Sequence, residues 1–120
     1  MESRKELTLI PKTTNYIKYI LNIIFKLPRT EKFNIGNEYK DVMYKMLEDV
    51  LMLSKVSLEE RLKYINRIDA RLNVQRIFLR IMVENKWIDE KKFKYSMELI
   101  DELGRIVGGL LKSYVKNNTK

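Results

Sequence analysis

The chain has 120 residues, of which 45% are hydrophobic and 33% are charged, so it has the size and composition of one globular domain. It contains no cysteine and no histidine, which excludes disulfides, thiol catalysis and the commonest metal ligand. Twenty-four Lys and Arg against 16 Asp and Glu give a net charge of +8. This excess either attracts polyanions or only keeps a helical protein in solution. We expect no metal and no cofactor and, because no secretory segment opens the chain, a cytoplasmic protein.

The first helix is expected at residues 13–27. Residues 1–12 are interpreted as a flexible arm that ends at Pro11, and Pro28 stops the helix, because proline interrupts helical hydrogen bonding. Its apolar surface favours burial between other helices, and its run of about a dozen residues is too short to span a bilayer. A membrane-surface anchor is the less favoured alternative, because such helices usually show a broad cationic face, so no membrane partner is expected. Only a narrow polar line interrupts this surface, made of Lys18, Asn22 and Lys26.

A long second helix is expected from about residue 36 to residue 53, because its apolar residues follow the i, i+3, i+4, i+7 spacing. The connection before it, residues 28–37, carries Phe33 and Ile35, which we expect to act as apolar plugs. Only about residues 55–57 link this helix to the next one. The two helices are therefore predicted to form an antiparallel hairpin.

The third helix, from Ser57 to Lys86, is the segment around which the rest is organised. Ser57 fits an N-cap, and Glu60 three residues later completes a capping box. At about 100° per residue, the charges of this helix fall into two rows. One row contains Lys63, Arg67 and Arg71, and the other contains Asp69, Asn73, Arg76 and Arg80.

The same helix carries a second apolar set, which lies roughly opposite its main apolar stripe. A helix with two apolar faces is usually contacted from two sides, so this set indicates that the protomer associates with something. Its members are Ala70, Val74, Ile77 and Ile81.

Asp89 fits the N-cap of the last helix. Gly104 and Gly108 stand four residues apart in the first apolar face of that helix, and Ile106 and Leu110 belong to a second apolar sector. An interior glycine costs a helix about 1 kcal/mol relative to alanine. We therefore interpret these four positions as serving close packing between helices or between protomers.

The predicted fold class is all-α, with no strand pattern anywhere in the sequence. Residues 13–116 are expected to form an up-down-up-down four-helix bundle, followed by a disordered tail at 117–120. The two terminal helices are more apolar than a monomer needs, which favours a homo-oligomer.

No arrangement of residues points to catalysis, and we expect that the protein is not an enzyme. Neighbouring carboxylates such as Asp101 and Glu102 diverge on a helix, and no glycine-rich phosphate loop is present. Arginine suits bidentate phosphate contact, so the basic rows predict a surface for nucleic acid or a partner. Pairing of individual arginines with acids on neighbouring helices is an equal alternative. The candidate binding residues are Lys63, Arg67, Arg71, Arg76 and Arg80.

Three segments resemble a known family of four-helix-bundle proteins. They are Leu-Pro-Arg-Thr-Glu-Lys-Phe-Asn-Ile-Gly at 27–36, Asp-Ala-Arg-Leu at 69–72 followed by Arg76 and Arg80, and Leu-Gly-Arg-Ile-Val-Gly-Gly-Leu-Leu-Lys at 103–112. In this order they are similar to the accessory variability determinant (Avd) proteins of diversity-generating retroelements and to the proteins encoded in 23S rRNA intervening sequences. The resemblance covers about residues 16–114. Family members often carry Trp at or beside the position of Leu111, and this departure leaves the branch open.

The resemblance implies a homopentameric barrel with a basic surface. It also implies binding to a retroelement reverse transcriptase and its template RNA, with DNA as a second candidate ligand, in support of mutagenic cDNA synthesis without catalysis. The alternatives are a protein of the 23S rRNA intervening-sequence type and a structural oligomer that bridges protein partners.

Overall fold

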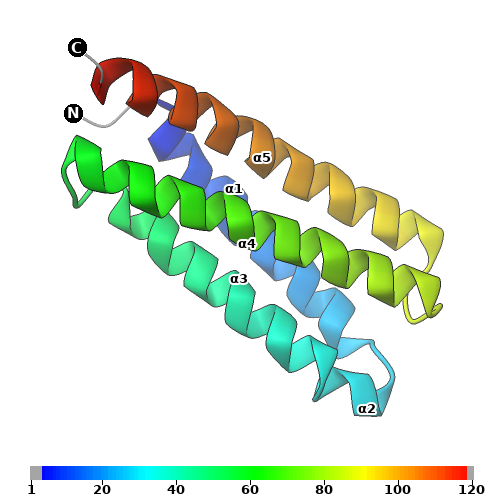
Figure 1. Ribbon diagram of the computed structural model, residues 1–120. Helices are drawn as coiled ribbons and strands as arrows, with labels where there is room; N and C mark the ends of the chain where they lie inside the picture. The colour runs from blue at the N-terminus through cyan, green and yellow to red at the C-terminus, as the bar shows by residue number, and fades with distance from the viewer. Residues whose placement is uncertain (1–3, 119–120) are drawn as a thin grey trace.

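The computed structural model describes residues 4–118 of the chain, and within that range it is helical with no strand. Four long helices and one single-turn helix follow one another (Figure 1): α1 (Arg4–Phe25), α2 (Arg29–Lys32), α3 (Ile35–Met52), α4 (Leu58–Glu84) and α5 (Glu90–Asn118). The predicted all-α four-helix bundle is therefore confirmed, with α2 as a short addition between the first two long helices.

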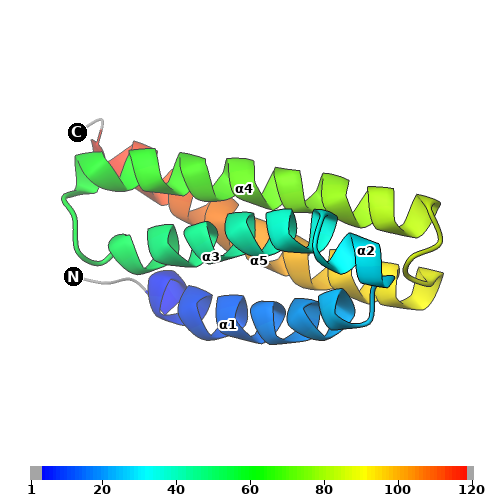
Figure 2. The same ribbon diagram turned by 90° about the horizontal axis from the view of Figure 1, so that it is seen from below.

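The long helices run antiparallel to their neighbours and form a rod of 51 × 23 × 20 Å (Figures 1 and 2). The main contacts of α1 are with α3 and α5, and those of α4 are also with α3 and α5, so α1 and α4 lie diagonally across the bundle. One end of the rod, the corner end, holds α2 and the α4–α5 connection. The opposite end holds the start of α1, the α3–α4 connection and the last turns of α5 (Figure 2).

The expected flexible arm at residues 1–12 is wrong for the part that the structure describes. α1 begins at Arg4 and runs through Pro11. The Thr13 hydroxyl donates to the Leu9 carbonyl at 2.7 Å, so a side-chain hydrogen bond joins the residues on either side of Pro11. Leu9 is buried, and burial of a leucine side chain contributes about 1.5–3 kcal/mol. The expected disordered tail at 117–120 is wrong for residues 117 and 118, which continue α5. Residues 1–3 and 119–120 lie outside the described range.

The predicted helix starts are confirmed by their hydrogen bonds. Ser57 Oγ accepts from the Glu60 backbone N–H at 3.3 Å, which caps α4. Asp89 Oδ1 accepts from the Lys92 backbone N–H at 2.8 Å, which caps α5. These two caps determine where the two longest helices begin.

A chain of buried hydrogen bonds joins α1, α3 and α4 inside the core. The Tyr16 hydroxyl donates to Gln75 Oε1 at 2.7 Å, so the Tyr39 hydroxyl, 2.6 Å away, donates to the Tyr16 oxygen. Gln75 Nε2 donates to the Arg71 carbonyl at 3.1 Å and lies 3.3 Å from Met46 Sδ. Burial raises the pKa of Tyr16 and of Tyr39 above the usual value of a phenol. The network fixes how these three helices face one another.

A second buried polar cluster joins α1, α4 and α5 at the end opposite to the corner end. Tyr114 donates its hydroxyl to Glu6 Oε2 at 2.5 Å, and Arg61 Nη1 lies 3.5 Å from the same oxygen. The Arg61 guanidinium also lies over the Tyr114 ring, 5.9 Å from its centre. Burial and the hydrogen bond to Glu6 raise the pKa of Tyr114. Glu6 thus connects the first turn of α1 to its neighbour α5 and to α4, which lies diagonally across the bundle.

The connection between α1 and α3 differs from the expected pair of apolar plugs. Ile35 packs against the core as expected, but Phe33 is 65% exposed. The chain turns tightly here, since a Cβ on Gly36 would lie 2.9 Å from Ile24 Cγ2 and 3.2 Å from the Glu31 carbonyl oxygen. Glycine at position 36 therefore lets α3 begin directly against α1.

Candidate nucleic-acid interface

The first predicted basic row lies on the side of α4 that faces α3, where it meets the buried carboxylate of Asp49. Arg71 hydrogen-bonds to Asp49 Oδ2 and donates to the Lys45 carbonyl at 3.3 Å. Arg67 Nη2 lies 3.1 Å from Asp49 Oδ1. Burial raises the pKa of the Asp49 carboxyl, and the two guanidinium groups, Arg71 first, oppose that shift. Asp49 therefore depends on these arginines for compensation of its buried charge.

The two arginines on Asp49 differ in how much surface they offer to a ligand. The Arg71 side chain is 25% exposed and is committed to the α3–α4 contact. The Arg67 side chain is 55% exposed and also stacks over the Tyr64 ring at 5.2 Å. Lys63 at the start of the row pairs with Glu60 one turn earlier on the exposed surface, where such pairs contribute little. Lys63 and Arg67 thus remain accessible to a phosphate.

The second row lies on the side of α4 that faces α5. Arg76 Nε and Nη2 lie 3.3 and 3.1 Å from Asp101 Oδ1, and its Nη1 donates to Asn73 Oδ1 at 2.8 Å. The pairing of Arg76 with Asp101, an alternative that the sequence left open, is therefore present. Arg80 is exposed and makes no ion pair with any described residue. Of this row, Arg80 is the cation that is free to bind a ligand.

The glycines of α5 do not bring two helix backbones together within the protomer, as a packing role would require. A Cβ on Gly104 would lie 2.8 Å from Arg76 Nη2, so this glycine makes room for the guanidinium that bonds Asp101. A Cβ on Gly108 would meet no atom within 4 Å. Leu110 is buried in the core and Ile106 packs against it, so both serve helix packing in the protomer.

The second apolar set of α4 forms an exposed strip, which we call the outer strip: Ala70, Val74, Ile77 and Ile81. Ile77 is 55% exposed, and Val74 and Ile81 are also exposed. The strip lies between the two basic rows, because one row faces α3 and the other faces α5. Apolar side chains in line on a basic helix are typical of a contact surface.

Sequence reasoning missed a second group of cations, which lies at the corner end. The first turn of α5 contributes Lys91 and Lys92 beside Tyr95, the exposed face of α1 contributes Lys18, and Lys26 directly follows α1. None of these four lysines makes an ion pair within residues 4–118. The Lys-Lys-Phe-Lys-Tyr run at 91–95 was the signal available in the sequence.

Residues 4–118 contain neither a candidate metal site nor a candidate membrane-spanning helix. No group of three or more acidic side chains within residues 4–118 is placed to hold a metal ion. No helix among those described is long and apolar enough to cross a membrane.

Comparison with known proteins places the bundle in a family. The family model described as bAvd-like matches residues 7–114, which is nearly the whole described chain. No curated protein matches the sequence. Among solved structures, a protein of unknown function from the S23 ribosomal protein family of Bacteroides thetaiotaomicron is similar in fold, with a TM-score of 0.80. The two share 10% sequence identity, and the similarity covers 90% of this chain and 98% of that one. The resemblance noted in the sequence is confirmed, and the chain belongs to the bAvd-like family.

Proposed function

We propose that this protein is a non-catalytic accessory protein that binds nucleic acid and a reverse transcriptase, and so supports mutagenic reverse transcription in a diversity-generating retroelement. Membership of the bAvd-like family over residues 7–114 is the observation that carries the proposal. The net charge of +8 and the accessible cations on α4 support it, because phosphate contacts dominate affinity for nucleic acid.

Within the predicted basic rows, the cations divide into two roles under this proposal. Lys63, Arg67 and Arg80 contact phosphate, since their side chains are exposed. Arg71 and Arg76 hold α4 against α3 and α5 through Asp49 and Asp101. The polymerase partner would contact the cations of α4 that stay exposed beside the outer strip.

The test is binding of labelled RNA and DNA, measured by fluorescence anisotropy over a range of salt concentrations. The double variant Lys63→Glu/Arg80→Glu is expected to weaken binding at least tenfold at low salt. The control variant Lys55→Glu/Lys112→Glu changes the net charge equally, at two exposed lysines that make no ion pair within the described chain. Equal losses in the two variants would show that only net charge matters. Absence of binding by the wild-type protein at low salt would refute the nucleic-acid role.

The reverse transcriptase part of the proposal has a separate test. The partner should co-purify with the wild-type protein, and its cDNA synthesis on the retroelement template should require the accessory protein. The Lys63→Glu/Arg80→Glu variant should lower both capture and cDNA yield. Full cDNA synthesis in the absence of the protein would refute the accessory role.

We also propose that the protomer assembles into a homo-oligomer, a pentamer by the family resemblance, through the outer strip of α4. The exposed apolar side chains of Val74, Ile77 and Ile81 support this, and so does the open space over Gly108 on the neighbouring helix. Light scattering should find a multimer that Ile77→Asp converts to a monomer, whereas Leu51→Asp, at a comparably exposed leucine of α3, leaves it intact. A wild-type monomer at working concentration would contradict the assembly.

One structural observation favours a second candidate, an oligomer that bridges protein partners. Arg71 and Arg76 are used in ion pairs within the protomer, which reduces the cationic surface available to phosphate. Such a bridging protein, or one of the intervening-sequence type, would bind its protein partners in a way that survives high salt. The salt titration above separates it from the leading proposal, because phosphate contacts weaken steeply with salt.

A further inference from the structure

The exposed face of α1 near the corner end is a cationic surface that the proposed function does not use. Lys18, Asn22 and Lys26 stand at four-residue intervals and are all exposed. Because α1 lies diagonally across the bundle from α4, this face is separate from the basic rows and from the outer strip. Neither lysine has a carboxylate partner within the described chain, so both ammonium groups are available to a ligand.

An open pocket of about 590 Å³ adjoins this face where α1 meets the start of α5. Tyr19 and Tyr95 meet there edge to face, with ring centres 4.7 Å apart and planes at 75°. Tyr95 is 48% exposed, so part of its ring is open to solvent. The ring of Tyr19, on α1, packs against the Tyr95 ring and limits its movement. Partial burial at this contact raises the pKa of Tyr19. This contact leaves the ring of Tyr95 as a pre-positioned surface for stacking.

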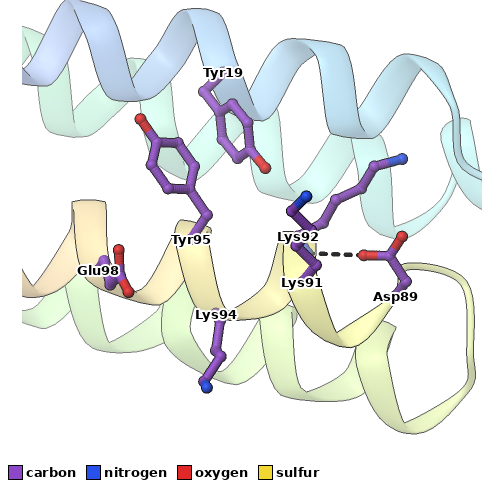
Figure 3. Close-up of a pocket in the computed structure, with 7 residues that line it drawn as sticks. All are labelled: Tyr19, Asp89, Lys91, Lys92, Lys94, Tyr95 and Glu98. Atoms are coloured by element: carbon purple, nitrogen blue, oxygen red, sulfur yellow. Dashed lines mark hydrogen bonds between the residues drawn. The ribbon is translucent and has the colours of Figure 1, made fainter.

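Lysines surround the two tyrosines in this pocket (Figure 3). The ammonium groups of Lys91 and Lys92 lie on the side of α5 that faces α1, while Lys94 projects the other way. Two carboxylates, Asp89 and Glu98, also line the pocket. Asp89 also accepts the N-cap hydrogen bond of α5, drawn as the dashed line in Figure 3. The pocket lining therefore carries three lysines against two carboxylates.

A second pocket, of about 370 Å³, adjoins the opposite edge of the same face, where α1 meets α2 and α3. Phe25 and Phe33 line it and are 72% and 65% exposed, a large apolar exposure for aromatic side chains. Lys32 lies 4.6 Å from the centre of the Phe25 ring, and Lys40 is a further lining residue. None of the described residues that line this pocket is acidic.

The helix geometry places the two aromatic pockets on either side of the lysine row. At 100° per residue, Lys18 and Asn22 fall between Tyr19 at one edge of α1 and Phe25 at the other, and Lys26 directly follows the last residue of the helix. Tyr19 and Phe25 are separated by about 9 Å along the helix axis, at a rise of 1.5 Å per residue. A ligand that occupies both pockets therefore crosses the lysine row. A strand of a few nucleotides is long enough to do so.

We propose that the face of α1 bearing Lys18, Asn22 and Lys26, with the Tyr19–Tyr95 and Phe25–Phe33 pockets at its edges, binds single-stranded nucleic acid. Unpaired bases stack in the two pockets and the backbone phosphates lie along the lysines. Alternation of exposed rings with unpaired cations is the surface that single strands require, whereas a duplex keeps its base faces covered. The inference rests on the proposed nucleic-acid role, and it adds a site on the side opposite to α4 that selects unpaired segments.

The test compares a labelled short single-stranded RNA with a duplex RNA of the same composition, by anisotropy, on the full chain. The double variant Phe25→Ala/Tyr95→Ala is expected to weaken single-strand binding at least about thirtyfold, because it removes two base-stacking contacts worth about fivefold or more each, and to leave duplex binding unchanged. Tyr44→Ala is the matched control, because Tyr44 on α3 is 42% exposed and lines neither pocket. Circular dichroism confirms that each variant is folded.

The lysine row has its own variant. Lys18→Glu/Lys26→Glu should reduce the slope of log affinity against log salt for the single strand by about 0.7 for each phosphate that the variant no longer binds. The equally charged control Lys55→Glu/Lys112→Glu should leave that slope unchanged. Photo-crosslinking of a 4-thiouridine strand should label Tyr95 or Phe25, as identified by mass spectrometry.

The outcomes separate the two proposals. Equal single-strand affinities for Phe25→Ala/Tyr95→Ala and for Tyr44→Ala, with salt-dependent wild-type binding retained, would overturn the α1 site and leave the proposed function standing. Equal losses for single strand and duplex would also overturn it, because the pockets would then not select unpaired bases. No wild-type binding of either RNA would overturn both.

Discussion

The buried hydroxyl of Tyr16 is the most informative group to remove, because it is the middle member of the Tyr39–Tyr16–Gln75 chain. Tyr16 accepts a hydrogen bond from Tyr39 at 2.6 Å and donates one to Gln75 Oε1 at 2.7 Å. All three residues are fully buried. Tyr16→Phe keeps the ring and its packing, and it removes both hydrogen bonds at once.

The expected cost follows from what each variant leaves without a partner. Tyr16→Phe leaves the Tyr39 O–H and Gln75 Oε1 unsatisfied, at about 1–3 kcal/mol for each buried group, so it should destabilise by about 2–6 kcal/mol. Tyr39→Phe removes only the end of the chain, and Tyr16 still donates to Gln75. Its cost should be about 1 kcal/mol. In a Tyr39→Phe background, Tyr16→Phe should therefore cost less than it does alone.

Equilibrium unfolding in urea, followed by circular dichroism, measures these free energies, and the double-mutant cycle gives the coupling. A coupling of at least about 1 kcal/mol is expected, because the two hydroxyls share one bond. The role of the buried hydrogen-bond chain is refuted if Tyr16→Phe lowers the free energy of unfolding no more than Tyr39→Phe does. It is also refuted if the effect of the double variant equals the sum of the two single effects.

Three further predictions concern other features of the bundle. Ser57→Ala should lower the free energy of unfolding by about 0.5–2 kcal/mol in urea titration, because it removes the cap of α4. Arg71→Ala should cost about 2 kcal/mol in the same assay, less than a fully buried pair, since Arg67 still lies 3.1 Å from Asp49. Stability should fall as the pH rises above about 10, because burial raises the pKa of Tyr16 in the folded state above the usual phenol value that it has in the unfolded chain. A flat profile of melting temperature between about pH 9 and pH 12 would contradict the last expectation.

Local signals in the sequence predicted the helices well, because caps and spacing are decided within a few residues. Ser57 and Asp89 cap the helices as expected. The flexible arm was wrong because the rule that proline breaks helices is also local. α1 stays helical on both sides of Pro11 because Leu9 is buried and Glu6 bonds to Tyr114. Both contacts involve residues far away in the sequence, which a local rule does not consider.

The binding surface was harder to predict, because the availability of a cation depends on how two helices are rotated against each other. The sequence placed Arg71 and Arg76 in the correct rows but could not choose between ligand and ion pair. The facing carboxylates, Asp49 and Asp101, lie 22 and 25 residues away in the chain. The same dependence on helix rotation explains Gly104. The sequence pattern indicates a close approach of two helix backbones there, whereas the structure shows that Gly104 makes room for the Arg76 side chain.

The cluster of Glu6, Arg61 and Tyr114 has a practical consequence for anyone who prepares fragments of this protein. A boundary drawn after Pro11 looks safe from the sequence, yet the shortened product would lack the carboxylate that neutralises Arg61 and that receives the Tyr114 hydroxyl. The Lys12–Glu102 bridge of 2.9 Å would then stand at the new, frayed start of the first helix. Residues 4–11 should therefore be kept in any expressed fragment. An affinity tag should be added before these residues and should not replace them.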